Sequence, residues 1–66
     1  MKIFVNGEAR EVPAGYTAAQ LITDMGIAGR RIAMEVNRDI LPRSAYATHT
    51  FSGGDKIEVV HAIGGG

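Results

Sequence analysis

The spacing of the apolar residues switches from strand-like to helix-like and back within only 66 residues. Most segments alternate apolar and polar residues with a period of two, which is typical of half-buried β-strands. One segment, residues 17–26, instead has the spacing of an amphipathic helix. A chain of this length buries only about 60% of its unfolded surface, so a short helix must dock against the strands. We therefore expect a single-domain α+β fold in which a mixed β-sheet wraps over one main helix.

The strands that precede the helix are expected to pair as a hairpin. Residues 2–6 and 8–12 supply the two strands. Asn6 and Gly7 lie between them, and this dipeptide accepts the positive φ angles of a tight hairpin turn.

The expected helix carries signals at both ends. Thr17 is a good N-cap residue, and Gln20 completes a capping box with it. Tyr16 and Leu21 occupy the two positions of a hydrophobic staple. Gly26 ends the helix with a residue that readily adopts the left-handed conformation. The apolar stripe that should face the sheet consists of Ala18, Leu21, Ile22 and Met25.

Three strands are expected after the helix, in the overall order β-β-α-β-β-β. Apolar and polar residues alternate over residues 32–37, which predicts a strand. Arg38 and Asp39 are expected to form a turn, and residues 40–41 a short strand that returns beside residues 32–37. Pro42 ends this short strand and cannot donate to a ladder, so the strand belongs at an edge of the sheet. A loop with one helical turn is expected at residues 44–51. A glycine turn at residues 53–55 then leads into the last strand, at residues 56–63.

Composition argues against several classes of function. Seven Lys and Arg residues balance seven Asp and Glu residues, so nucleic-acid binding by phosphate neutralisation is unsupported. Cysteine is absent, which excludes disulfides, thiolate catalysis and Cys-based zinc sites. His49 and His61 have no metal-ligand spacing. No segment approaches the roughly 20 apolar residues of a membrane span. We expect a cytoplasmic protein that is not an enzyme and binds no cofactor or metal by itself.

The last three residues are the exception to this absence of chemistry. Residues 1–63 are expected to form the domain, and Gly64, Gly65 and Gly66 a flexible tail. Glycine has no Cβ, so such a tail can thread a channel that is too narrow for side chains. The Gly66 carboxylate becomes an electrophile once it is activated as a mixed anhydride with AMP. The alternative from the residues alone is a frayed chain end.

Several short motifs resemble the ThiS family, the bacterial sulfur carriers of thiamine biosynthesis, which have a ubiquitin-like β-grasp fold. Residues 1–5 also resemble the first strand of ubiquitin. In chain order, the matching motifs are Asn6-Gly7-Glu8, Gly15-Tyr16-Thr17, Asn37, Ile40-Leu41-Pro42-Arg43, Gly54-Asp55-Lys56-Ile57-Glu58-Val59 and Gly65-Gly66. A third glycine at position 64 exceeds the two that this family requires.

The resemblance implies partners and a reaction. A ThiF-like adenylyltransferase would use ATP and magnesium to adenylate the Gly66 carboxylate. Sulfur from a cysteine desulfurase pathway would displace AMP and leave a thiocarboxylate. Thiazole synthase (ThiG) would then take the sulfur for the thiazole ring, while Gly64 and Gly65 lie in the partner active site.

A docking surface is expected on the side of the sheet that faces away from the helix. Its residues are Phe4, Ala33, Val60 and Ala62, with Glu35 at its edge and Ile63 at the base of the tail. The alternative is ordinary scattered apolar surface, which needs no partner. Three other functions stay open: a MoaD-like carrier for molybdopterin synthesis, a ubiquitin-like protein modifier, and a β-grasp interaction module with an irrelevant tail.

Overall fold

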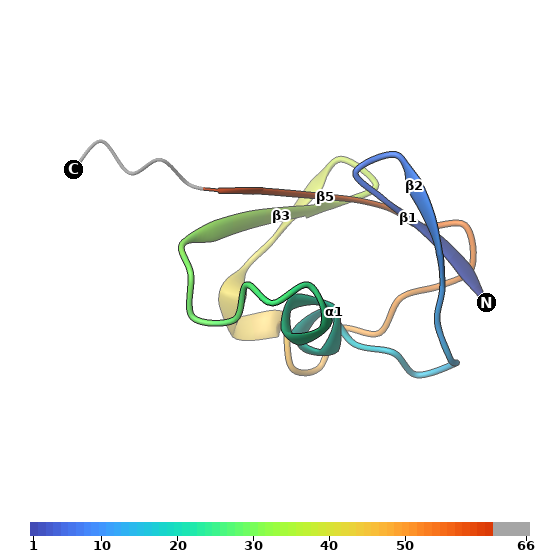
Figure 1. Cartoon of the computed structure of the whole chain (residues 1–66), viewed down its shortest axis with the longest axis horizontal. Coiled ribbons are helices and arrows are strands. Elements are labelled where there is room, and N and C mark those ends of the chain that lie inside the picture. The colour runs from blue at the N-terminus through green and yellow to red at the C-terminus, as the bar shows by residue number, and fades with distance from the viewer. Residues whose placement is uncertain (62–66) are drawn as a thin grey trace.

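The computed structural model describes residues 1–61, which form one five-stranded sheet and one α-helix (Figure 1). The elements are β1 (Lys2–Val5), β2 (Glu8–Glu11), α1 (Ala18–Asp24), β3 (Ile32–Val36), β4 (Asp39–Leu41), the 3₁₀ helix η1 (Arg43–Ala45) and β5 (Lys56–His61). The strand order is β2-β1-β5-β3-β4. β1 and β5 run parallel, and the other neighbours run antiparallel. The predicted element order and the mixed sheet are confirmed.

The helix begins and ends where the sequence predicted. The Thr17 hydroxyl accepts a hydrogen bond from the backbone N–H of Gln20, and the Gln20 side chain accepts one from the backbone N–H of Thr17. Met25 is the C-cap, and Gly26 follows it with a φ of 74°. The helix has only seven residues, so its stability depends on packing against the sheet.

Both hairpin turns use residues in the left-handed region. Asn6 and Gly7 have φ angles of 51° and 85°, as the sequence predicted. In the second hairpin the predicted turn was wrong by one residue. Asn37 and Arg38 hold the positive φ angles, at 52° and 74°, and Asp39 already belongs to β4. Asparagine tolerates this conformation better than most residues do. Hydrogen bonds to Lys56, the first residue of β5, and to Asp55, which precedes that strand, also hold the Asn37 side chain.

The predicted edge position of the strand that Pro42 ends is confirmed, because β4 is the last strand of the sheet. The single helical turn predicted within residues 44–51 is present as η1, although it starts at Arg43, one residue earlier. β5 is described only as far as His61. The predicted extension of this strand to residue 63 lies outside the described residues.

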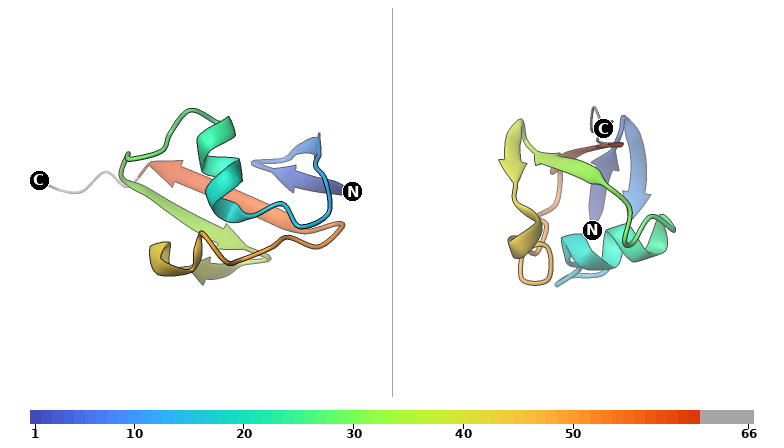
Figure 2. Two further views of the ribbon diagram at one scale, coloured as in Figure 1. Left: turned by 90° about the horizontal axis from the view of Figure 1, so that it is seen from below. Right: turned by 90° about the vertical axis from the view of Figure 1, so that its left-hand side faces the viewer.

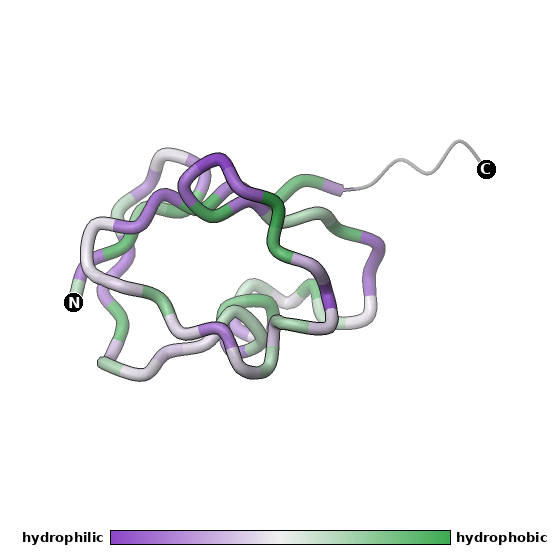
Figure 3. The backbone as a smooth tube through the Cα atoms, turned by 180° about the vertical axis from the view of Figure 1, so that it is seen from behind, coloured by the Kyte–Doolittle hydropathy of each residue, from purple (hydrophilic) through white to green (hydrophobic). Residues whose placement is uncertain are grey.

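The core lies between the concave face of the sheet and α1. Its largest fully buried side chains are Ile3, Leu21, Met34 and Ile57, each at most 1% exposed. The end-on view shows the sheet curving over the helix (Figure 2, right). Apolar and polar residues interchange along the strands instead of forming separate segments (Figure 3), because only one face of the sheet is buried.

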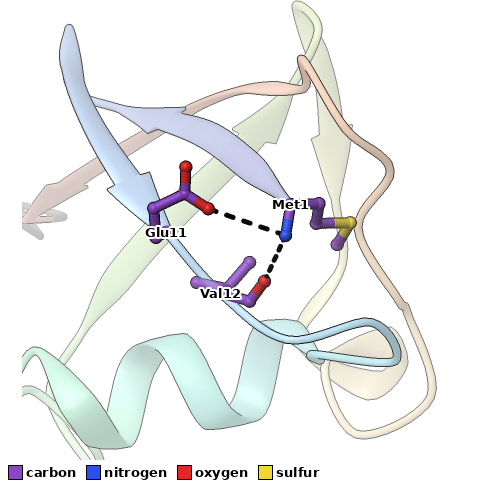
Figure 4. Close-up of polar contacts among 3 residues, drawn as sticks. All are labelled: Met1, Glu11 and Val12. Carbon is purple, nitrogen blue, oxygen red and sulfur yellow. Dashed lines mark hydrogen bonds and ion pairs between the residues drawn. The ribbon is translucent and has the colours of Figure 1, made fainter.

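The β1–β2 ladder extends by one residue pair at Met1. The Met1 amino group donates to the Val12 carbonyl at 2.7 Å, and the Val12 N–H donates back to the Met1 carbonyl at 2.9 Å. The same amino group lies 3.7 Å from the Glu11 carboxylate (Figure 4). These contacts hold the start of β1 against the end of β2.

A buried phenol ties the entry of the helix to its last turn. The Tyr16 hydroxyl donates to the Asp24 carboxylate, and the Tyr16 side chain belongs to the core. Burial raises the pKa of Tyr16, and the hydrogen bond and charge of Asp24 raise this pKa further, against an opposing effect of Arg10. Arg10, which interrupts the apolar pattern of β2, thus acts electrostatically on the Tyr16 hydroxyl, just before α1.

Candidate functional site

β5, the strand that leads to the glycine tail, lies in the middle of the sheet. It pairs with β1 on one side and with β3 on the other, and its last described residue, His61, lies opposite Ile32. The segment that leads into the tail is therefore supported by two neighbouring strands. The predicted roles of Ala62, Ile63 and residues 64–66 lie outside the described residues, so the division into a domain and a tail stays a prediction.

Two turn asparagines fasten β5 in place. The Asn6 Oδ1 accepts from the Val59 N–H at 2.9 Å, and the Asn6 Nδ2 donates to the Val59 carbonyl at 3.2 Å. The Asn37 Oδ1 accepts from the Lys56 N–H at 2.9 Å, and the Asn37 Nδ2 donates to the Asp55 carboxylate at 3.0 Å. The two hairpin turns therefore hold the central strand through side-chain bonds that the sequence analysis did not foresee.

The sheet face that points away from α1 carries the predicted docking residues. Ala33 and Val60 lie directly opposite each other on β3 and β5. Ala33 is exposed, and the Val60 side chain keeps 56% of its surface accessible. Glu35 is half-buried on the same face, one alternation away from Ala33. The structure thus brings Ala33, Val60 and Glu35 together at the end of the sheet from which the tail would leave.

Phe4 belongs to the same face but lies at its other end. It is half-buried and pairs with Lys56, whereas Val60 is two alternations further along β5. Two alternations correspond to about 13 Å along a strand. The predicted docking residues therefore do not form one continuous apolar patch within the described part of the chain.

Ile40 is an apolar residue on this face that the sequence analysis did not include. Its side chain is 75% exposed, more than that of any other large apolar residue in the described range. The β3–β4 register places Ile40 opposite Glu35, on the outer face. The sequence could have predicted this position of Ile40, because a two-residue turn at positions 37 and 38 makes Glu35 and Ile40 cross-strand partners.

Two carboxylates face each other between these apolar residues. Glu35 and Glu58 are direct partners across the β3–β5 ladder. Like charges directly opposite each other destabilise a sheet. The pairing depends on the register of two strands that are distant in the sequence, so the sequence pattern alone did not reveal it. We define the outer patch as Ala33, Glu35, Ile40, Glu58 and Val60.

Two further findings concern metal binding and membrane-spanning helices in residues 1–61. Within residues 1–61, no three His, Asp or Glu side chains gather closely enough to hold a metal ion. Over the same residues, no helix combines the length and apolar character that crossing a bilayer requires.

Comparison with known proteins identifies the family. The ThiS family model matches residues 3–66. The sulfur carrier protein ThiS of Escherichia coli K12 is 32% identical over 66 residues, which cover all of both chains. This chain belongs to the ThiS family. The family is that of the sulfur carriers of thiamine biosynthesis, as the sequence motifs predicted.

Solved structures agree with this assignment. The crystal structure of the thiamine biosynthesis protein ThiS from Geobacter metallireducens superposes with a TM-score of 0.84 at 28% identity, and each chain is covered completely. The NMR structure of the Geobacter metallireducens protein gives a TM-score of 0.74, with 88% of that chain covered. The predicted ubiquitin-like β-grasp fold is thereby confirmed.

Two longer relatives place a similar segment within an enzyme chain. Thiazole synthases of Paramagnetospirillum magneticum and Magnetococcus marinus are 42% and 41% identical to this chain over all 66 residues. The chain spans only one fifth, 20%, of the length of each of these relatives. A ThiS-like segment thus occurs in one polypeptide with a protein named thiazole synthase.

Proposed function

We propose that this ThiS-family chain carries sulfur as a thiocarboxylate on Gly66 and delivers it to a thiazole synthase. The observation that carries the proposal is the match along the whole of the Escherichia coli sulfur carrier, together with a family match that reaches residue 66. The chain itself acts as a co-substrate and not as an enzyme. We place this exchange in the cytoplasm, as expected from the cysteine-free sequence.

The proposed reaction takes place at one carboxyl group, first at its oxygen and then at its carbon. A Gly66 carboxylate oxygen attacks the α-phosphorus of ATP on a ThiF-like adenylyltransferase, and pyrophosphate leaves with its magnesium. A persulfide sulfur from a cysteine desulfurase pathway then attacks the carbonyl carbon, and AMP leaves. A thiol reductant cleaves the resulting acyl disulfide, which leaves the thiocarboxylate on Gly66 and the oxidised thiol as a disulfide. Gly64 and Gly65 suit this role because residues without a Cβ allow close approach of the partner's backbone.

The thiazole synthase partner has support of its own. The two longer relatives join a segment like this chain to a protein named thiazole synthase. Joining two modules raises their effective concentration, which is useful when one must repeatedly reach the active site of the other. We propose that this chain makes the corresponding contact as a separate partner.

The outer patch is the proposed docking surface for the adenylyltransferase. Exposed Ile40 and Val60 offer apolar contacts. The facing carboxylates of Glu35 and Glu58 repel each other, so a cation between them would be stabilising. A partner arginine at this point would relieve their repulsion and bond both carboxylates. The adenylyltransferase surface should therefore present apolar side chains around at least one arginine or lysine.

Intact-protein mass spectrometry tests the proposal. The chain is incubated with ATP, magnesium, the cognate adenylyltransferase and a sulfur donor. The expected product is heavier by the difference between one sulfur and one oxygen atom, and it is absent when ATP is omitted. Conjugates to other proteins would instead indicate a ubiquitin-like modifier. A chain that lacks Gly65 and Gly66 should remain folded and unmodified, and thiamine-free growth supported by this truncated chain would refute the proposal.

A further inference from the structure

The two neighbours of β5 accompany it over different lengths. The β3–β5 register runs from Ile57 to His61, whereas the β1–β5 register stops at the pair of Val5 and Ile57. β1 turns away at Asn6, and β2 returns on the far side of β1. The tip of β5 therefore projects past the β1–β2 hairpin and has β3 alone beside it (Figures 1 and 2).

The backbone groups of every second residue of β5 point to the side of β1. The carbonyls of Asp55 and Ile57 accept from the N–H groups of Phe4 and Asn6, at 2.9 and 2.8 Å. The N–H and carbonyl of Val59 point the same way and pair with the Asn6 side chain. Since these directions alternate along a strand, the next groups on this side belong to His61, two residues further on. Within residues 1–61 they have no partner there.

His61 thus begins an open sheet edge at the point where the chain continues toward Gly66. An unpaired edge of this kind is a template for an added strand. The Asn6 amide occupies the backbone groups of Val59, so pairing with an added strand begins at His61. Exposed Val60, a member of the outer patch, is the residue between these two positions. A strand added at the open edge is therefore continuous with the outer patch.

We propose that the adenylyltransferase adds an extended segment to this edge and pairs its backbone with the N–H and carbonyl of His61. The proposal rests on the proposed function, in which the enzyme receives Gly66 in its active site. The five residues after His61 span at most about 18 Å when fully extended, so the enzyme surface must come within that distance of the open edge. Three of these five residues are glycines without side chains, so the enzyme has mainly backbone groups to bond.

Backbone pairing has two properties that suit a carrier. A ladder register fixes the position of a chain in steps of about 3.3 Å per residue, so pairing at His61 sets how far the following residues can reach. Each hydrogen bond adds only a modest net free energy, so the contact guides the tail without preventing release.

Two proline variants probe the open edge. His61→Pro removes the N–H that faces it, and proline is tolerated in a strand where the N–H faces solvent. Ala9→Pro is the matched control at the opposite edge of the sheet, on β2. Phe4, the register partner of Ala9, donates to Asp55 instead, so the Ala9 N–H points away from β1. Circular dichroism and thermal unfolding establish that each variant is folded.

Adenylation is followed as pyrophosphate release with each chain as the substrate. We expect His61→Pro to lower kcat/KM about fivefold, the effect of one backbone hydrogen bond. Ala9→Pro should react as the unmodified chain does. His61→Ala, which keeps the N–H and removes the imidazole, should lose less than His61→Pro. Equal losses in His61→Pro and either of the other two variants, or no loss in His61→Pro, would overturn the proposal.

Amide hydrogen exchange, measured by NMR, tests the pairing in the unmodified chain. The isotopically labelled chain is mixed with a saturating concentration of unlabelled adenylyltransferase. The His61 N–H should exchange about tenfold more slowly in the complex, whereas the Ala9 N–H should exchange equally fast in both states.

Unchanged exchange at His61, in a chain that still forms the thiocarboxylate, would overturn the strand addition and leave the carrier function intact. Slow exchange at His61 in the free chain at high concentration would assign the edge to a second copy of the chain, and it would also overturn the proposal. Failure of the unmodified chain to form a thiocarboxylate would instead refute the proposed function.

Discussion

The side-chain amide of Asn6 pairs with both backbone polar groups of Val59, across 53 positions of the sequence. Asn6 lies in the β1–β2 turn, directly beyond the end of β1. Its amide therefore continues the parallel β1–β5 ladder after the strand itself has turned away. The same residue supplies the positive φ of the turn and a contact that holds the central strand.

The Asn6→Gly variant separates these two contributions. Glycine accepts the positive φ but removes the amide, so the loss should reflect the two hydrogen bonds to Val59. We expect the free energy of unfolding to fall by about 2 kcal/mol. Urea unfolding followed by circular dichroism measures this change. Stability equal to that of the unmodified chain would show that water replaces the amide without loss.

The facing carboxylates of the outer patch predict a stabilising substitution. Glu58→Gln removes the repulsion with Glu35 and should raise the free energy of unfolding by about 0.5 kcal/mol. The gain should shrink at high salt, because exposed charges are screened. Glu8→Gln is the matched control, since Glu8 pairs with the apolar Val5. Urea unfolding at low and high salt should show no comparable gain in this control.

The outer patch should control adenylation. Val60→Glu places a charge among its apolar side chains and should lower kcat/KM for adenylation by about tenfold, the typical effect of a hot-spot residue. Ile40→Glu should have a similar effect, because Ile40 is even more exposed than Val60. Both variants should keep the circular dichroism spectrum of the unmodified chain.

Phe4→Glu tests whether the docking surface reaches the far end of the same face. The sequence analysis included Phe4 in this surface, so the variant is also expected to weaken adenylation. Ala14→Glu, at an exposed position on the loop before α1, is the control for added negative charge. Adenylation kinetics that are unchanged in Phe4→Glu but slower in Val60→Glu would confine docking to the tail end of the face.

The Tyr16–Asp24 hydrogen bond predicts the response to alkaline pH. The folded-state pKa of Tyr16 is raised above the ordinary value of 10.0, chiefly by burial and then by Asp24. The folded chain thus keeps the phenol proton that the unfolded chain releases, and stability should fall as the pH rises above 10. The Tyr16→Phe variant should lose about 1 kcal/mol at neutral pH but lack this component of the alkaline decline.

Absorbance of the phenolate provides the second measurement for this prediction. The chain has only two tyrosines, so Tyr46→Phe isolates the signal of Tyr16. The titration midpoint of Tyr16 should lie above 10.0 in the folded chain and return to that value in urea. A midpoint at or below 10.0 in the folded state would contradict the buried hydrogen bond.

The sequence by itself determined the local elements and the family. The capping box at Thr17, the glycine after the helix and the turn at Asn6 depend on residues close together in the chain, and each was predicted correctly. Strand alternation likewise indicated which side chains enter the core, because the period of two is a property of the backbone. The second turn was misplaced by one residue because the alternating pattern assigned Asn37 to the strand, although asparagine tolerates the positive φ that it adopts.

Only the tertiary structure decided how distant segments meet. The Asn6–Val59 pairing and the facing Glu35 and Glu58 follow from the register of segments that are far apart in the sequence. The open edge at His61 exists because β1 turns away at Asn6 while β5 continues beside β3. Local sequence fixes φ angles and periodicity within a few residues. Register and the neighbours of each strand result instead from burying the whole core at once, so no local pattern can specify them.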